Sequence, residues 1–501
     1  MRIKNLDTLT SHGNIKGRAF VARILEAGMQ AADPYYNTLD LLEIRDDKLY
    51  LGNDEFAMTG APFGTHVIYS RGDLDRVFIF GAGKGALSVA KALEDKLGDW
   101  LTGGYVIAKH GDDIITTKIK VKLAAHPVPD QHCIDGCVEM ERMIKDSKLT
   151  ERDLVFTIIG NGVSALMTYP IEGLNIDDVS EVTRYLQIER GANTGDVNTV
   201  RFAIDRLKAG RITKLLAPAK MAHLFAISTN AKTGGSGYNV ERGLPLGTFL
   251  ATMPSKVSAK RALEVLKRFD ALERMPKVVE CLKKLPDEEI PLSVKEFEAM
   301  DARLYGVMPE SRSMPQRVED TCRELGFTPY VFLRTTTIEA SAMGKVMALL
   351  ALSVDRGDAV YKAPCVIINY GEMIVTVGDS PGVGGRNQEF ALTGAVVING
   401  NDRIVMGAVD TDGTDGPGGN FDDEAYANGI RNLAGGIVDG YTMKEAAELG
   451  VDVTQALHTH ATSGALWKLR SGVHAVQNIS LNDIALTLIM AKEDTRATTE
   501  K

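Results

Sequence analysis

The sequence has little that would suit an oxidising compartment, a polyanionic partner or a membrane. Only five of its 501 residues are cysteines, with no Cys-x-x-Cys spacing and no His/Cys cluster, which fits a reducing cytosol without structural disulfides or zinc. The 57 Lys+Arg against 66 Asp+Glu leave a net charge of −9 and no basic face for nucleic acid. No segment sustains the apolar length of a membrane span. We therefore expect a cytoplasmic protein that binds neither nucleic acid nor membrane and takes small molecules instead.

Apolar residues are plentiful, at 44% of the chain, which is enough for two or three domains. Short apolar runs alternate with amphipathic stretches, a pattern typical of βα units and a largely parallel sheet. We predict an α/β protein of two α/β domains, the first a Rossmann-like doubly wound and mainly parallel sheet. The expected boundaries are 1–60 for an N-terminal helical segment, 61–252 for the Rossmann-like domain, 253–303 for a helical connector and 304–501 for the C-terminal α/β domain.

The first chemical signal is the stretch VFIFGAGKGALSVAKAL, an apolar strand that ends in a glycine-rich turn and passes directly into a helix. Free N–H groups and the positive end of the helix dipole converge there on an anion site, in which Lys84 could neutralise a phosphate or carboxylate. The same letters satisfy G-x-G-x-x-A, but the next strand ends in Lys109 and His110, so NAD is disfavoured and NADP stays open. A tight turn with a surface lysine is the structural alternative.

Two further signals follow the next strands. In KLAAHPVPD, two prolines stiffen a loop that presents His126 and Asp130 at a strand's C-terminal end, where ligands of open α/β sheets bind. In TIIGNGVSALM, Asn161 and Ser164 stand in another strand, turn and helix arrangement. Each is equally compatible with a structural turn in which the side chains only cap backbone groups.

Two stretches in the C-terminal half complete the set. DTDGTDGPGG places three aspartates among glycines after an apolar strand, and we expect Asp412 and Asp415 to hold magnesium there. In GVGGRNQEF, the glycines allow close approach of the chain and Arg386 offers a fork that could grip a phosphate. RNQEF could equally be a helix N-terminus with Arg386 in a surface ion pair.

Taken together, these stretches resemble the class II glycerate kinases, also called glycerate 2-kinases, whose C-terminal part is the MOFRL domain. The motifs that carry the resemblance stand in the family's order: GAGKGA at 81–86, AAHPVPD at 124–130, GNGVSALM at 160–167, NTVRFAIDRLKAGR at 198–211, GEMIVTVGDSPGVGGRNQEF at 371–390 and DTDGTDG at 410–416. The resemblance implies transfer of phosphate from ATP, with Mg²⁺, to the 2-hydroxyl of D-glycerate in a cleft between the two domains. Its catalytic lysine and arginine fall on Lys84 and Arg386.

The remaining positions carried over from the family are expected to bind substrate or nucleotide. They are Gly81, Gly83, Gly85, His126, Asp130, Asn161, Ser164, Arg201, Glu372, Gly384, Gly385, Asn387 and Glu389, with Asp412 and Asp415 for the metal. The chain departs from the family at Phe202 and Ala203 and in the loops 228–233 and 475–480. Another short sugar acid as acceptor, an NADP-dependent hydroxypyruvate or tartronate-type reductase, and a catalytically silent binding protein therefore stay open, as does homo-oligomerisation.

Overall fold

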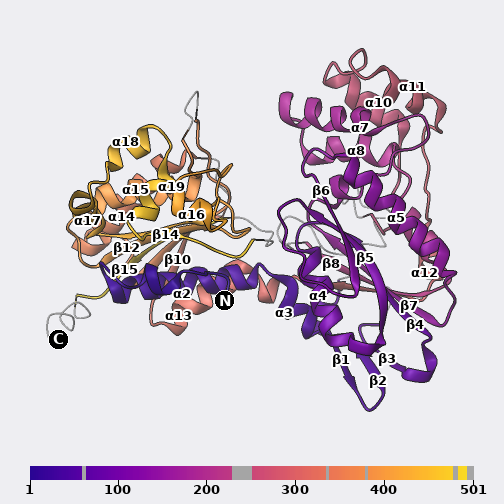
Figure 1. Cartoon of the computed structure of the whole chain (residues 1–501), viewed down its shortest axis with the longest axis horizontal. Coiled ribbons are helices and arrows are strands. Elements are labelled where there is room, and N and C mark those ends of the chain that lie inside the picture. The colour runs from indigo at the N-terminus through magenta and orange to yellow at the C-terminus, as the bar shows by residue number, and fades with distance from the viewer. Residues whose placement is uncertain (59–63, 228–250, 335–337, 378–381, 478–482, 493–501) are drawn as a thin grey trace. The chain divides into compact units, whose positions relative to one another are not determined.

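The computed structural model describes residues 1–501 except 59–63, 228–250, 335–337, 378–381, 478–482 and 493–501 (Figure 1). The chain forms two compact units. Residues 1–32 and 312–501 make unit 1, and residues 33–311 make unit 2. Each unit is an α/β structure around its own six-stranded sheet, in agreement with the predicted fold class.

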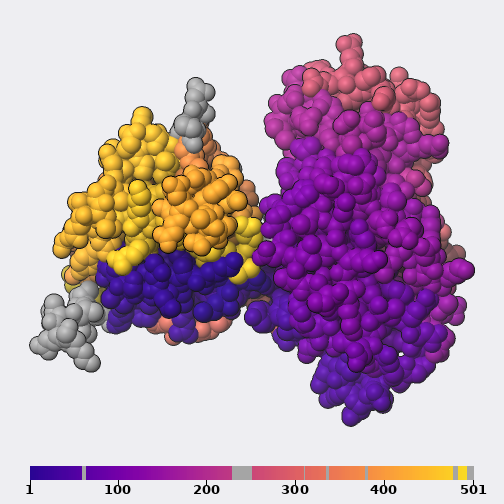
Figure 2. Space-filling model, in the orientation of Figure 1, coloured from indigo at the N-terminus to yellow at the C-terminus, as the bar shows by residue number. Residues whose placement is uncertain are grey.

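These units divide the chain differently from the expected boundaries. The first 32 residues belong with the C-terminal half, and 253–303 lie within unit 2. In the space-filling view, the N-terminal residues (indigo) lie against the orange and yellow C-terminal part of unit 1 (Figure 2). The reason is that the helix α2 (Ile15–Ala31) buries Val21, Ile24 and Leu25 in a core shared with strands of unit 1.

The main sheet of unit 2 is entirely parallel, with the strand order β6-β5-β4-β7-β8-β9. This is the 3-2-1-4-5-6 order of doubly wound dinucleotide-binding folds, so the Rossmann-like prediction is confirmed. Its strands are β4 (Arg76–Ala82), β5 (Leu101–Lys109), β6 (Ile119–Ala124), β7 (Asp153–Gly160), β8 (Lys220–Ala226) and β9 (Ala302–Gly306). The strand order reverses between β4 and β7, where their loops leave in opposite directions.

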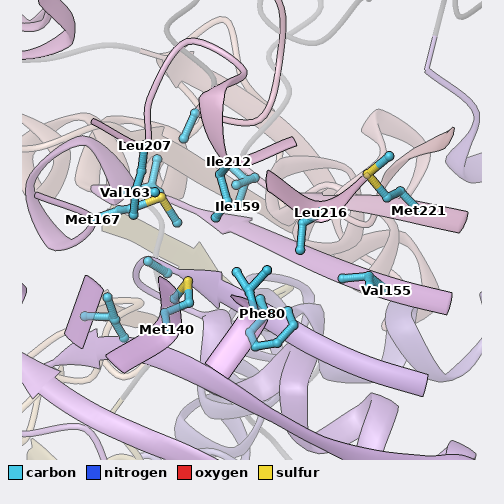
Figure 3. Close-up of a cluster of buried hydrophobic side chains, with 14 of the residues drawn as sticks. Phe80, Met140, Val155, Ile159, Val163, Met167, Leu207, Ile212, Leu216 and Met221 are labelled. Carbon is cyan, nitrogen blue, oxygen red and sulfur yellow. The ribbon is translucent and has the colours of Figure 1, made fainter. Parts of the chain in front are cut away.

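Both faces of this sheet are buried, because successive strand residues point to opposite sides. On one face, Phe80, Val155 and Ile159 pack with residues of α5 (Gln131–Ser147), α6 (Val163–Leu166) and α9 (Arg211–Leu216), as the close-up shows (Figure 3). On the other face lie α4 (Ala86–Leu97) and a small antiparallel sheet of β1 (Leu42–Arg45), β2 (Lys48–Leu51) and β3 (Val67–Ser70). That small sheet lies partly in the segment expected to be helical.

A separate helical cluster stands at one end of unit 2 (Figure 1). Its members are α7 (Ile176–Thr183), α8 (Thr194–Ala203), α10 (Ala259–Arg268) and α11 (Pro276–Lys284), which share one apolar core. The segment expected to be a connector therefore packs against helices that precede it by some 80 residues. α12 (Val294–Glu298) and β9 then return the chain to the main sheet.

Unit 1 has a mixed sheet in the order β10-β11-β15-β12-β13-β14, in which only β10 and β11 are parallel. Its strands are β10 (Thr328–Leu333), β11 (Cys365–Tyr370), β12 (Ile404–Asp410), β13 (Gly435–Asp439), β14 (Gly472–Val473) and β15 (Asp483–Ile489). β11 pairs with β10 on one side and with β15 on the other.

Helices cover both faces of the unit 1 sheet. α2 and α13 (Met314–Glu324) pack on one face, with the short α1 (Leu6–Leu9) beside them. The other face carries α14 (Ala340–Arg356), α15 (Arg386–Ile398), α17 (Thr442–Leu449), α18 (Val453–His458) and α19 (Thr462–Lys468). α16 (Asp423–Ala427) follows β12. Among the described residues, no helix has the length and apolar character needed to cross a membrane.

Candidate active site

The loops after β4 and β7 meet at the point where the strand order of unit 2 reverses. The N–H of Lys84 donates to the carbonyl oxygen of Asn161 at 2.7 Å, which joins the two loops. Gly83 has φ +127°, and a Cβ there would lie 2.5 Å from the backbone of Gly160. Only glycine permits this approach, so the glycine-rich turn brings Lys84 and Asn161 together at the edge where such folds bind ligands.

A buried arginine lies beneath these loops. Arg201, at the end of α8, donates to Ser164 Oγ at 3.1 Å, to Thr183 Oγ1 at 2.6 Å and to the Pro127 carbonyl oxygen at 3.0 Å. No carboxylate of the described residues lies within ion-pair distance of it, and its side chain is buried. Burial lowers the pKa of this guanidinium to about 10. A buried cation without a counter-ion is costly unless an anion binds beside it.

His126 lies in the same pocket. Its ring covers Gly162, since a Cβ on that glycine would come within 2.5 Å of the imidazole Nε2. Burial first, and then the charges of Lys84, Arg201 and Lys109, lower the pKa of His126 to about 3, so the ring is neutral at pH 7. The structure thus brings together Lys84, His126, Asn161, Ser164 and Arg201 in one electropositive cluster of side chains suited to a small anion, hereafter the pocket residues.

Asp130 faces elsewhere. It caps the N-terminus of α5, with its Oδ1 accepting from the backbone N–H groups of Ala125 and Cys133, and its Oδ2 lies beside His110 and His132. Burial would raise the pKa of this carboxyl, but the hydrogen bonds, that from His110 foremost, lower it to about 2. Asp130 makes no hydrogen bond to the pocket residues, so it is the one predicted position of this loop that the geometry separates from them.

In unit 1, Arg386 opens α15 and is engaged by two carboxylates. Its Nε donates to Asp483 at 2.5 Å, and its Nη2 donates to Asp410 at 2.7 Å and to Asp483 at 2.9 Å. Burial works against the charge, but Asp483 and Asp410 raise the pKa of this guanidinium above its usual value. Nη1 alone has no hydrogen bond to a described residue. Asp483, which was not among the expected site residues, stands directly opposite Asp410 on the neighbouring strand.

Asp415 caps the same helix. Its Oδ1 accepts from the Asn387 N–H and its Oδ2 from the Gln388 N–H, at 3.2 and 2.9 Å, and the side chain is buried. A Cβ at Gly385 would lie 2.3 Å from this carboxyl group, and one at Gly384 would lie 2.3 Å from Thr462 Oγ1. The loose backbone of GVGGRNQEF therefore has an internal cause, the close approach of Asp415 and of the chain before α19.

The other predicted positions of this loop differ in their surroundings. The Nδ2 of Asn387 donates to Asp415 at 3.2 Å, while its Oδ1 is buried without a hydrogen-bond partner among the described residues. Glu389 is buried and lies 2.9 Å from His460 Nδ1. Glu372 is exposed, 3.9 Å from Arg386 Nη2. Glu389 thus holds a neighbouring loop, whereas Glu372 and Asn387 flank the arginine.

The carboxylates around Arg386 fit a divalent cation in their chemistry. Asp415 Oδ1 and Oδ2 each accept a backbone N–H, so this predicted ligand already has a structural contact at both oxygens. Asp410, Asp412 and Asp483 offer the oxygen ligands that Mg²⁺ prefers, with only one arginine among them. Burial first, and then Asp412 and Asp483, raise the pKa of Asp410 well above its usual value. This surplus of negative charge is what a bound cation would balance.

Comparison with known proteins agrees with this division of the chain. Residues 20–229 match a domain of unknown function, DUF4147, and residues 365–478 match the MOFRL family. A glycerate 2-kinase of Pyrococcus horikoshii is 27% identical over 474 residues, which cover 94% of this chain and 97% of the relative. A protein of Agrobacterium vitis with the provisional name hydroxypyruvate reductase is 26% identical over 83% of this chain and all of its own. A crystal structure of a P. horikoshii protein covers 95% of this chain and 99% of its own with a TM-score of 0.66 at 26% identity.

The chain is an α/β protein with two six-stranded sheets, and its C-terminal part matches the MOFRL family. The two family matches and the relatives make the chain similar to glycerate 2-kinases over most of its length. This confirms the resemblance drawn from the order of its motifs. The loop 228–233, and residues 478–480 of the altered loop near the end, lie outside the described residues.

Proposed function

We propose that the protein is a glycerate 2-kinase, which transfers the terminal phosphoryl group of ATP to the 2-hydroxyl of D-glycerate. The observation that carries the proposal is the buried guanidinium of Arg201, which has no carboxylate partner in the described chain and stands where doubly wound folds bind ligands. Glycerate has a carboxylate, to which this guanidinium could donate charge-assisted hydrogen bonds. The name of the P. horikoshii relative supports the same acceptor and reaction.

The pocket residues divide the work of binding and positioning. Arg201 and Ser164 would hold the glycerate carboxylate, and Lys84 would meet the transferred phosphoryl group. The 2-hydroxyl oxygen forms the new bond to the γ-phosphorus, and the bond from that phosphorus to the β–γ bridging oxygen breaks, so that ADP leaves with its electron pair. The hydroxyl proton passes to a base. His126 is uncharged, but its pKa of about 3 makes it a weak proton acceptor, so water takes the proton.

The unit 1 residues would act on the nucleotide. Arg386 is held in place by Asp483 and Asp410, which leaves its Nη1 hydrogens for a phosphate oxygen. Asp412 has one oxygen bound to Thr414, while the other makes no hydrogen bond to a described residue. Asp412 and Asp410 would hold Mg²⁺, which when bound supplies positive charge against the phosphates.

Product analysis tests this proposal directly. Purified protein is incubated with ATP, Mg²⁺ and D-glycerate, and the product is identified by ³¹P NMR against 2-phosphoglycerate and 3-phosphoglycerate. We expect 2-phosphoglycerate, formed at a rate that falls about 100-fold or more in Lys84→Ala. Lys91→Ala is the matched control, because Lys91 lies on α4 and pairs only with Asp95 at the surface. Formation of 3-phosphoglycerate, or equal loss in both variants, would contradict the proposal.

The altered residues support glycerate as the acceptor. Phe202 and Ala203, which replace two cations of the family pattern, are both 2% exposed and pack in the helical core of unit 2. They do not border the pocket, so their change does not by itself reshape it. We expect kcat/KM for D-glycerate to exceed that for erythronate and threonate, and a higher value for either four-carbon acid would contradict this.

A reductase is the second candidate, favoured by the dinucleotide-type strand order and by the name of the A. vitis relative. Against it, β5 ends in Lys109 and not in the acid that would bind an NAD ribose. Oxidation of NADPH with hydroxypyruvate, followed by absorbance, separates the two functions. We expect no oxidation above the rate without enzyme.

A further inference from the structure

We propose that His110, Asp130 and His132 form a binding site for a divalent transition metal such as Zn²⁺, separate from the nucleotide-associated cation. His110 Nε2 lies 2.9 Å from Asp130 Oδ2, and His132 Nδ1 lies 3.1 Å from the same oxygen. The two ring nitrogens are 3.4 Å apart. The three ligand atoms thus form one compact triangle at the surface of unit 2.

The dimensions of this triangle suit a metal. With metal–ligand bonds of about 2.0–2.1 Å, neighbouring ligand atoms lie about 2.9 Å apart in octahedral and about 3.3 Å apart in tetrahedral coordination. The three observed separations, 2.9, 3.1 and 3.4 Å, cover this range. A metal would therefore need only small side-chain movements to take the place of the present hydrogen bonds.

The fold holds all three side chains before any metal binds. The N–H of His110 donates to the Ala124 carbonyl oxygen at 2.9 Å, which fixes the end of β5 beside the end of β6. Asp130 Oδ1 is held by the N–H groups of Ala125 and Cys133, at 3.1 and 3.3 Å, so Oδ2 is turned toward the imidazoles. His132 lies in the first turn of α5. Such outer contacts fix the orientation of metal ligands in proteins.

The chemistry of the ligands selects the class of metal. Two imidazole nitrogens and one carboxylate oxygen favour zinc, cobalt, nickel or copper over Mg²⁺, which prefers oxygen ligands. Exposed fractions of 45%, 32% and 50% for the side chains of His110, Asp130 and His132 leave room for water at further coordination positions. The thiol of the neighbouring Cys133 is buried and donates to the Ala125 carbonyl oxygen at 3.6 Å, so it stands outside the cluster.

The consequence for the fold is local. A metal here would tie the end of β5 to the start of α5 across the loop that carries His126. Binding to the folded state alone stabilises it, so the melting temperature should rise with metal concentration. The sequence could not reveal the cluster, because His110 lies 20 residues before Asp130 and the pairing of β5 with β6 brings them together.

Metal titration of the metal-free full chain tests the site without any assay of turnover. In excess Mg²⁺, we expect one Co²⁺ per chain to bind with visible ligand-field absorption, and Zn²⁺ to displace it. Affinity should fall about 10-fold or more in His110→Ala and in His132→Ala, and about 100-fold in the double variant. His66→Ala is the control, because His66 is exposed and contacts only one carboxylate group, that of Asp54.

Three results would overturn the proposal. The first is Co²⁺ binding of equal affinity in the wild type and the double variant. The second is an electron paramagnetic resonance spectrum of the Cu²⁺-loaded wild type without nitrogen hyperfine coupling from two imidazoles, which needs no variant to fold. The third is a rise of melting temperature with Zn²⁺ that persists in the double variant.

Discussion

Replacing Arg201 by methionine should lower kcat/KM for D-glycerate about 100-fold at almost no cost in stability. The pKa of Arg201 is lowered by burial from 12.5 to about 10. Each pKa unit corresponds to about 1.4 kcal/mol, so keeping this charge in the folded state costs about 3 kcal/mol. Methionine removes that cost. It also removes hydrogen bonds to Ser164, Thr183 and the Pro127 carbonyl, each worth about 1 kcal/mol net, so the two effects nearly cancel.

The measurement compares Arg201→Met with a matched buried arginine. Arg18 is also buried, but it pairs at 2.5 Å with Asp439, whose side chain is equally inaccessible. Breaking such a pair leaves a buried charge alone, so Arg18→Met should lower the free energy of unfolding by about 3–5 kcal/mol. Urea denaturation of both variants should show a change within about 1–2 kcal/mol for Arg201→Met, while its kcat/KM for D-glycerate falls about 100-fold.

The reasoning would be refuted by either of two results. If Arg201→Met destabilised the protein as much as Arg18→Met, the charge of Arg201 would have a counter-ion in the folded protein. If it retained full kcat/KM, the pocket would not hold the acceptor's carboxylate. A further check is that D-glycerate should raise the melting temperature of the wild type and not that of Arg201→Met.

Three other predictions concern Arg386, the aspartates near it, and a buried histidine. Arg386→Lys loses the fork held by Asp483, and kcat should fall by about two orders of magnitude in steady-state assays, with full turnover as the contrary result. Asp412→Asn should raise the Mg²⁺ concentration needed for half-maximal rate, whereas Asp415→Asn should lower the melting temperature instead; equal effects on both readouts would contradict the separation of roles. His223 is fully buried, and burial lowers its pKa to about 3, so the unfolded chain alone binds its proton below pH 6.5. As the pH is lowered from about 5.5 to 4.5, this residue should therefore reduce the free energy of unfolding by about 1.4 kcal/mol per pH unit. Urea denaturation of His223→Gln should show a smaller decrease in the free energy of unfolding over the same pH range.

The Rossmann-like unit could be predicted from the sequence because its signals are local. Strands buried on both faces read as continuous apolar runs, and Gly83 and Gly162 mark the turns that follow two of them. Since parallel strands end at the same edge of a sheet, residues just after their strands, such as Lys84 and Asn161, are expected at that edge. Their proximity could therefore be predicted from their positions relative to the strands.

Partners that are distant in sequence could not be predicted in this way. Arg386 and Asp483 are 97 positions apart, and the pairing of β15 with β12 is what brings Asp483 to the arginine. The packing of α2 could not be predicted either, because its apolar residues do not indicate which sheet they cover, and that sheet is formed by strands of the C-terminal half. The surroundings of Asp415 could not be predicted either. Spacing shows which carboxylates are close in sequence, but not that backbone N–H groups already occupy the oxygens of Asp415.

That occupation explains why GVGGRNQEF and DTDGTDG occur together in one chain. Asp415 caps the helix that Arg386 opens, and Gly385 must lack a Cβ for the carboxyl group to come so close. Either motif alone would leave an uncapped helix or a buried carboxylate without donors, both of which are costly. Much of the shared pattern is therefore structural, and it places Arg386 where Asp410 and Asp483 can orient it. Two groups near this helix keep no hydrogen bond to a described residue, the Nη1 of Arg386 and the second oxygen of Asp412, and the proposed nucleotide binding uses both.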